Sequence, residues 1–330
     1  MPQLALTSTN ILIACALLYS FLNGIQDGAN TVATVITSRA LPPRWALVLV
    51  SIAEFCGPFV FGVAVARTIG AGTVDASAMT TPVLIAALLS AGLWNVVTWR
   101  LGIPSSSSHA LIGGLLGAVL AATGLDWGVL QPRGWLMVVV GLFAVPVISI
   151  LASYWVMQGI KFVLRSATPK VNWIFRRGQL VTTVGLALSH GANDASKSMG
   201  LLATGLVAAG QLERFEVPLW VVAVTAGAMA LGTLLGGYRI IRTLGTRFYR
   251  VRPIHAFSSQ LASGLMVLAA SLTGLPVSTS QVVSASIAGV GAAERFNKVR
   301  WGVMREVLIA WLLTIPLTAL AGALAYLLIR

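Results

Sequence analysis

An aspartate interrupts apolar sequence at two places, in Gly24-Ile-Gln-Asp-Gly-Ala-Asn30 and in His190-Gly-Ala-Asn-Asp-Ala-Ser-Lys197. Asp27 follows an apolar run that ends at Leu22, and Asp194 follows one that ends at Leu188. The whole chain carries nine aspartates and glutamates, so each carboxylate inside an apolar run is unusual. Because burial of a carboxylate in a membrane segment costs several kcal/mol, an intramembrane aspartate marks an ion or substrate site.

The composition is that of a polytopic membrane protein. The 330 residues are 57% hydrophobic and 9% charged, with a mean hydropathy of +0.88, whereas soluble domains carry about 25% charged residues. Lipid leaves no water to pair backbone groups, which predicts an all-α fold. The start of the chain lacks the basic and cleavage signals of a secretory leader, so we expect the first helix to be retained. We expect ten apolar segments, near residues 10–36, 45–66, 82–101, 104–123, 134–157, 178–207, 218–238, 255–275, 277–293 and 302–329.

The net charge of +13 reports membrane orientation rather than a nucleic-acid partner. Lysines and arginines cluster in short loops at 158–177 and 239–252, which is the pattern of cytoplasmic loops in membrane proteins. The two cysteines, Cys15 and Cys56, both lie in apolar segments, so we expect neither a disulfide framework nor a paired metal site.

The two halves of the chain repeat one another in order. Gly24-x-x-Asp27 corresponds to Gly191-x-x-Asp194, with an offset of 167 residues. The stretches 62–70 and 237–245 share an Arg-Thr-x-Gly ending, with an offset of 175, and 102–109 matches 274–281 with an offset of 172. Three matches in one order indicate a duplication, with a first repeat at 1–157, a basic cytoplasmic linker at 158–177 and a second repeat at 178–330.

Counting spans from the basic loops predicts an inverted arrangement of the repeats. We place both loops on the cytoplasmic side of the cell (inner) membrane. Counting back five segments from the loop 158–177 then puts the N-terminus outside, and counting forward puts the C-terminus outside as well. The helix of Asp27 then runs inward and that of Asp194 runs outward. Inverted repeats are typical of secondary transporters, whose site lies at the repeat interface. The count would change if 104–123 and 277–293 were re-entrant hairpins.

Two serine- and threonine-rich motifs predict an anion site. Pro104-Ser-Ser-Ser-Ser-His109 and Pro276-Val-Ser-Thr-Ser-Gln281 each open an apolar helix rich in small residues. Serine and threonine cap helix N-termini, and those termini attract anions. Lys197, three residues after Asp194, either neutralises that aspartate or helps to hold an anion, and His190 and His109 are either donors or neutral packed side chains. The candidate anion ligands are Ser106, Ser107, Ser108, His109, Ser278, Thr279, Ser280, Gln281, Lys197 and His190.

The aspartates themselves fit a cation. Asp27 and Asp194 are accompanied by Asn30 and Asn193, and carboxylate and amide oxygens suit a hard ion such as Na⁺. A buried aspartate that carries a proton is the open alternative. Glu54 lies in the second apolar segment, and alignment through Gly57 and Gly232 gives it Met229 as its partner in the other half. Glu54 is therefore a candidate for cation coupling that breaks the symmetry.

These motifs closely resemble the inorganic phosphate transporter (PiT) family over nearly the whole chain. The resemblance is carried by Asn23 to Asn30, Ser38 to Leu41, Pro104 to Gly114, Ser189 to Asp194, Pro276 to Gly291 and Val299 to Gly302. It implies cation-coupled phosphate uptake, a homodimer in the lipid membrane and an alternating-access cycle. It also implies that the Asp/Asn motifs, Asn23 included, and two Ser/Thr-opened helical hairpins form the site, and that Glu54 is important for transport.

The anion and the transport mode have alternatives. Gln26 and Gln281 occupy positions that are often Asn and His in this family, and some members carry sulfate. Phosphate keeps a proton that a free carboxylate can accept and sulfate does not, so we expect a Na⁺- or H⁺-driven phosphate symporter, with sulfate second and an anion channel third. Three scattered histidines argue against a membrane phosphatase or lipid-modifying enzyme, so we expect no enzyme and no cofactor beyond the coupling ion.

Overall fold

The computed structural model describes residues 2–166, 168, 171–236, 238–243 and 251–330, and within those ranges it consists of helices and turns without a β-strand. Much of the predicted basic loop 239–252, and the repeat residues Gly237 and Gly245, lie outside the described residues. The first half holds α1 (Pro2–Thr37), α2 (Pro43–Phe61), α3 (Ala64–Ala71), α4 (Thr81–Leu101), α5 (Ser107–Ala122), α6 (Pro132–Val139) and α7 (Val145–Val163). The second half holds α8 (Asn172–Ala208), α9 (Leu219–Leu235), α10 (Tyr238–Arg242), α11 (Pro253–Thr273), α12 (Thr279–Arg295) and α13 (Trp301–Ile329).

The outer surface of the bundle is apolar and its centre is polar. Among the described residues, six helices or joined helices are long and apolar enough to cross a membrane. Trp155, Leu312 and Leu320 are each more than 60% exposed on the outside, whereas the polar motif residues lie inside. This inside-out distribution confirms the prediction of an all-α, multi-pass membrane protein.

Two of the predicted segments are interrupted at equivalent points. The segment expected at 45–66 ends as a helix at Phe61, because Gly62 adopts a φ of 78°, and α3 then begins at Ala64. The segment expected at 218–238 ends at Leu235, where Gly236 adopts a φ of 74°. Positive φ is accessible to glycine at little cost and ends a helix. The predicted bounds of both segments are therefore wrong at their C-terminal ends.

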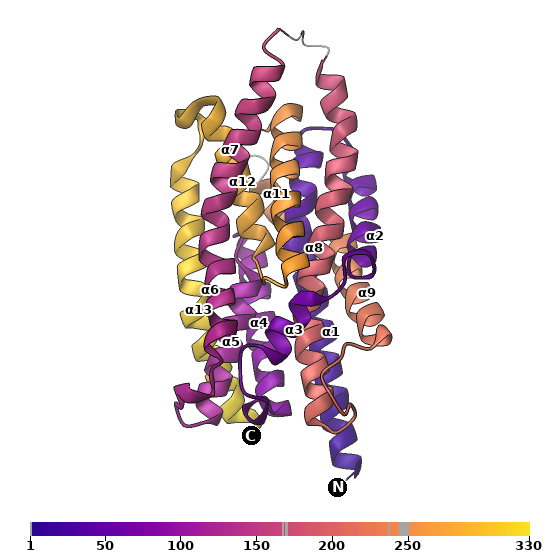
Figure 1. The fold of residues 1–330 in the computed structure, drawn as a ribbon, viewed down its shortest axis with the longest axis vertical. Coiled ribbons are helices and arrows are strands. Elements are labelled where there is room, and N and C mark those ends of the chain that lie inside the picture. Colours follow the sequence, from indigo (N-terminus) through magenta and orange to yellow (C-terminus); the bar gives the residue numbers. More distant parts are fainter. Residues whose placement is uncertain (1, 167, 169–170, 237, 244–250) are drawn as a thin grey trace.

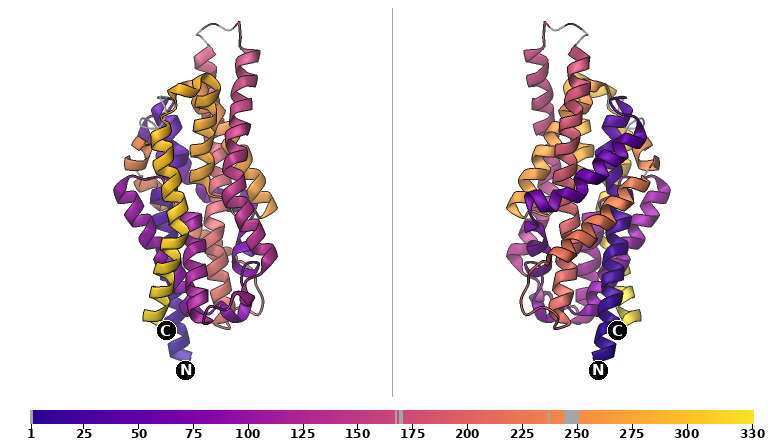
Figure 2. Two further views of the ribbon diagram at one scale, coloured as in Figure 1. Left: turned by 90° about the vertical axis from the view of Figure 1, so that its left-hand side faces the viewer. Right: turned by 90° about the vertical axis from the view of Figure 1, so that its right-hand side faces the viewer.

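The helices of the two halves pack in matching pairs. α1 packs against α9 as α8 packs against α2, and α5 packs against α13 as α12 packs against α7. Figure 1 shows both chain ends at one end of the molecule and the α7–α8 connection at the other, so that α1 and α8 run in opposite directions. In the right-hand view of Figure 2, α2 and α9 lie as two slanted helices across the face of α1 and α8.

Two helical hairpins enter from opposite ends and meet at their tips. Figure 1 shows α4 and α5 in the half nearer the chain ends and α11 and α12 in the other half. Gly102 and Gly274, at φ of 68° and 71°, end α4 and α11 and begin the tips. The tips are joined because Ser280 Oγ donates to Ser105 O at 2.8 Å and Ser108 Oγ donates to Val277 O at 3.0 Å.

Each tip is also held by a threonine in or directly after a short helix of the other half. Thr68 of α3 donates its hydroxyl to Gly274 O at 2.7 Å. Thr243, directly after α10, donates its hydroxyl to Gly102 O at 2.9 Å. These residues are the aligned pairs of the Arg-Thr-x-Gly and Gly-x-Pro matches, so the sequence correspondence reappears as a matched pair of contacts.

The close crossing of α8 and α2 predicts a stability loss for Gly191→Ala. A Cβ at Gly191 would lie 2.0 Å from the Glu54 carbonyl oxygen, so the helices would have to separate. Overpacking of this kind costs about 1–3 kcal/mol. Gly185→Ala, on the same helix with no neighbour within 4 Å of the added Cβ, is the matched control. We expect a lower melting temperature in detergent for the first variant only, and equal values would contradict the close crossing.

Candidate ion and anion site

The site is built on two unbroken helices that cross their partners at glycines. Asp27 lies in the C-terminal third of α1 and Asp194 lies within α8, and each is 1% exposed. A Cβ at Gly24 would lie 2.0 Å from the Met229 carbonyl oxygen, and one at Gly191 the same distance from that of Glu54. The matched contacts agree with the alignment of Glu54 with Met229 and bring Glu54 beside the Asp194 motif.

A buried charge cluster connects α2 and α8. The His190 ring lies between two carboxylates, with Nδ1 at 2.7 Å from Glu54 Oε1 and Nε2 at 2.8 Å from Asp194 Oδ2. The other oxygen of Asp194 accepts from Lys197 Nζ, which also donates to Ser108 Oγ at 2.6 Å. Lys197 therefore neutralises Asp194, and it also reaches the first hairpin.

The bridging histidine requires an extra proton. A neutral imidazole carries one N–H, yet both ring nitrogens of His190 lie at hydrogen-bond distance from carboxylate oxygens. The chain of Glu54, His190 and Asp194 must therefore hold one proton more than two ionised carboxylates and a neutral ring would. With both nitrogens engaged, His190 has no ring N–H left for an anion in this conformation.

Asp27 forms a second polar cluster with the first hairpin. Its carboxylate accepts from Ser107 Oγ and, at 3.1 Å, from Asn30 Nδ2. The amide oxygens of Asn23, Gln26 and Asn30 are buried and have no hydrogen-bond partner among the described residues. These residues follow helical spacing along one face of α1. Unpaired carbonyl oxygens beside a carboxylate form the donor set of a hard cation.

Asn193 has a different environment from Asn30. Its Nδ2 donates to Leu275 O at 3.2 Å, and its Oδ1 accepts from the Val277 backbone N–H at 3.4 Å. Both amide atoms thus hold the tip of the α11–α12 hairpin. In this conformation Asn193 positions the hairpin, whereas Asn30 contacts its aspartate directly.

The hydroxyls of the two hairpins divide into capping groups and groups that face charges. Ser106 Oγ caps α5 by accepting from the His109 N–H at 3.0 Å, and Ser278 Oγ caps α12 by accepting from the Gln281 N–H at 3.4 Å. Three other hydroxyls contact charged groups. Ser107 donates to Asp27, Ser108 accepts from Lys197, and Thr279 donates to Asp194 at 3.4 Å. Ser280 joins the tips, as described above.

His109 and Gln281 lie together on another side of the hairpins. His109 Nδ1 and Gln281 Nε2 are 3.5 Å apart, and the His109 ring stacks on Phe143. Both residues line a cavity of about 290 Å³ whose other walls are mainly apolar side chains of α7 and α13. Gln281 Oε1 is buried without a hydrogen-bond partner in the described part of the chain. Within the described ranges, no hydrogen bond joins His109 or Gln281 to the carboxylates of the site.

Several residues around the site were not predicted. Thr31 and Thr233 donate to the two oxygens of Glu54 at 3.2 and 2.6 Å. Gln26 Nε2 donates to Ser105 Oγ at 2.6 Å, and Tyr19 donates its hydroxyl to Ser107 O at 3.3 Å. Thr233 directly follows Gly232, which was used to align the repeats, but nothing in its local sequence shows that it faces Glu54.

The whole site is sealed in this conformation. Every predicted anion or cation ligand is 2% exposed or less. Three carboxylates, at Asp27, Glu54 and Asp194, face one lysine and one protonated or proton-sharing histidine. The buried centre therefore carries net negative charge and stands directly beside hydroxyl and ammonium donors.

Comparisons with known proteins agree on one family. A model described as "Phosphate transporter family" matches residues 23–173 and again residues 164–322. The chain is 41% identical over 321 residues to a probable low-affinity inorganic phosphate transporter of Rhizobium meliloti, covering 96% of this chain and 94% of that protein. It is 38% identical over 328 residues to a protein of the same description from Bacillus subtilis, covering 98% of each.

A solved structure shares the fold. It is described as "The sodium-dependent phosphate transporter", and it superposes with a TM-score of 0.89 over 98% of each chain at 24% identity. The two ranges matched by the family model overlap at residues 164–173, and the division at the 158–177 linker stays a prediction.

Proposed function

Because the chain belongs to the phosphate transporter family, we propose that it is a symporter that takes up inorganic phosphate with Na⁺ or H⁺. The main support for cation coupling is the net negative charge of the sealed centre, where the carboxylates of Asp27, Glu54 and Asp194 outnumber the cationic groups. An anion entering this centre meets repulsion unless a cation enters with it. Binding of the cation is thus a precondition for binding of the anion.

The cation binds along the face of α1 that carries Asp27. Asp27 and the unpaired oxygens of Asn23, Gln26 and Asn30 hold Na⁺. The Glu54, His190 and Asp194 chain, which already shares a proton, is the site for H⁺. The anion is held by Lys197 and by hydroxyls of Ser107, Ser108 and Thr279 once these exchange their present partners for it.

The inverted arrangement supplies alternating access. Support comes from the opposite directions of α1 and α8, the matched helix pairs and the two hairpins that enter from opposite ends. We propose that each hairpin closes the path from one side, that the chain termini lie outside, and that the protein acts as the homodimer implied by its family resemblance. Motion of one bundle against the other then exposes the site to each side in turn.

Membrane voltage makes coupling necessary. Inward movement of a phosphate dianion against a membrane potential of about 100 mV, inside negative, costs about 4.6 kcal/mol of free energy. Two co-transported monovalent cations offset that electrical cost, and a third makes uptake electrogenic.

Uptake into proteoliposomes tests the proposal. Radiolabelled phosphate and sulfate are offered with Na⁺ and pH gradients imposed separately. We expect accumulation of phosphate above the external concentration under an inward Na⁺ gradient, which is tested first because a protein of this fold is described as sodium-dependent. Accumulation of sulfate instead would assign the sulfate alternative, and equilibration without accumulation would assign a channel.

Glu54→Gln tests the proton-sharing chain. The amide keeps the size of the side chain and can still accept from Thr233, but it removes one of the two carboxylates around His190. We expect the cation concentration for half-maximal uptake to rise about tenfold, which corresponds to about 1.4 kcal/mol. Met229→Gln, at the aligned position of the other half, is the matched control. Unchanged cation dependence in Glu54→Gln would remove Glu54 from the coupling site.

A further inference from the structure

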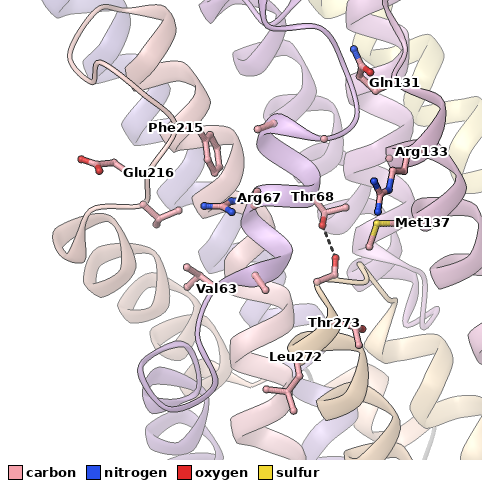
Figure 3. Close-up of a pocket in the computed structure, with 16 residues that line it drawn as sticks. Val63, Arg67, Thr68, Gln131, Arg133, Met137, Phe215, Glu216, Leu272 and Thr273 are labelled. Carbon is pink, nitrogen blue, oxygen red and sulfur yellow. Dashed lines mark hydrogen bonds between the residues drawn. The ribbon is translucent and has the colours of Figure 1, made fainter.

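A cavity of about 820 Å³ lies outside the sealed site, at the end that holds the chain termini. Its lining comes from α3, the start of α6, the α8–α9 connection and the last residues of α11. Figure 3 shows Thr68 in the middle of this lining, with its hydroxyl directed at the hairpin tip. The cavity therefore ends at the α11–α12 hairpin.

One short stretch of that hairpin separates the cavity from the charge cluster. Gly274, which lines the cavity, accepts from Thr68. Three residues later, Val277 O accepts from Lys197 Nζ at 2.7 Å on the buried side. The intervening Leu275 O is held by Asn193. Displacement of this one tip would connect the cavity with Lys197.

The cavity carries two arginines on its walls. Arg67 of α3 and Arg133 of α6 are exposed, and neither has an ion pair among the described residues. Figure 3 places them on either side of Thr68, Arg67 toward Phe215 and Arg133 beside Met137.

The acidic groups around the cavity are already engaged. The Glu216 carboxylate points away from the cavity in Figure 3 and lies 3.8 Å from the Arg214 guanidinium. Nearby, the Asp75 carboxylate accepts from the Gln131 amide. The lining thus contains two arginines and one glutamate, and that glutamate lies beside Arg214, so the walls carry net positive charge, whereas the sealed centre beyond the tip is negative.

We propose that this cavity is an entry site for oxyanions, in which Arg67 and Arg133 concentrate phosphate dianion at the α11–α12 tip before the tip opens. A cleft lined by one sign of charge focuses the electric field and raises the local concentration and the on-rate of the opposite ion by 10-fold or more. The entry site solves a problem that the negative centre creates, since a dianion has to approach before it is neutralised. This inference rests on the proposed function and adds the place where its substrate is collected.

The double variant Arg67→Gln with Arg133→Gln tests the entry site. We expect KM for phosphate to rise about tenfold in proteoliposomes at low ionic strength, with Vmax and Na⁺ dependence unchanged because the sealed centre is intact. We expect added choline gluconate to raise KM of the unaltered protein and to have little effect on the double variant, since salt screens the same charges that the mutation removes. Arg67→Lys with Arg133→Lys keeps the charge and should keep KM.

A control variant and two distinct negative results separate a failure of the entry site from a failure of the proposed symport. Arg177→Gln removes an exposed arginine at the opposite end, where its guanidinium lies 4.0 Å from the Trp173 ring centre, and should leave KM unchanged. If the double variant transports with the KM and salt dependence of the unaltered protein, the entry site is wrong and the symporter stands. If the unaltered protein accumulates no phosphate, the proposed function itself fails.

Discussion

Asp27→Asn is expected to abolish cation-driven phosphate uptake while the protein remains folded. The amide has nearly the shape of the carboxylate and can still accept from Ser107 or Asn30. It cannot supply the negative charge that joins the unpaired oxygens of α1 into a cation site. Loss of about 2.8 kcal/mol of cation binding lowers occupancy, and with it uptake, about 100-fold.

Proteoliposome uptake and thermal unfolding together measure this effect. Asp126→Asn, an exposed carboxylate in the α5–α6 connection, is the control and should transport normally. Phosphate uptake by Asp27→Asn at the normal rate and with the normal ion dependence would show that the cation binds elsewhere. A large drop in melting temperature would instead mean that Asp27 is mainly structural.

Lys197→Met is expected to have the largest combined effect, removing both transport and stability. The Lys197 residue is 1% exposed, and its ammonium contacts Asp194, Ser108 and Val277 O. Methionine fills a similar volume but leaves Asp194 without its cation and Val277 O without its donor. Removal of one partner from a buried ion pair costs about 3–5 kcal/mol.

A double-mutant cycle separates the charge from the contacts. Lys197→Met combined with Asp194→Asn removes both members of the pair, so we expect part of the lost stability to return. Transport should remain absent, because Lys197 is the ammonium donor to the proposed anion. Equal stability of the single and double variants would contradict an ion pair that matters for folding, and transport by the single variant would remove Lys197 from the anion site.

Local sequence was sufficient to predict contacts within a helix. Lys197 and Asp194 meet because residues three apart share a helix face, and Asp27 meets Asn30 for the same reason. The two serine-rich motifs predicted that helices open there, and the structure places the helix starts at Ser107 and Thr279, two to three residues after the predicted segment starts. The paired glycines and aspartates also predict a division into two repeats, and the family model matches the chain twice.

Contacts between helices could not be predicted in the same way. The partners of Glu54 come from α1, α8 and α9, and no spacing in the sequence relates Thr31, His190 and Thr233 to one another. Asn193 directly precedes its aspartate and Asn30 follows its own by three residues, but the sequence does not show that the α11–α12 tip occupies the amide of Asn193. The shared Arg-Thr-x-Gly motif was visible, but its threonines acquire a role only when each reaches a hairpin of the other half.

The glycine crossings separate the architecture of the centre from its chemistry. At both crossings a helix approaches a partner's backbone carbonyl, and the residue that owns that carbonyl is Glu54 in one half and Met229 in the other. The spacing of the helices depends on the missing Cβ of Gly24 and Gly191, so the partner's side chain is free to differ. After a duplication, one position can therefore acquire a charge while its counterpart stays apolar, and a symmetric scaffold can evolve a directional preference for ions without rebuilding its backbone.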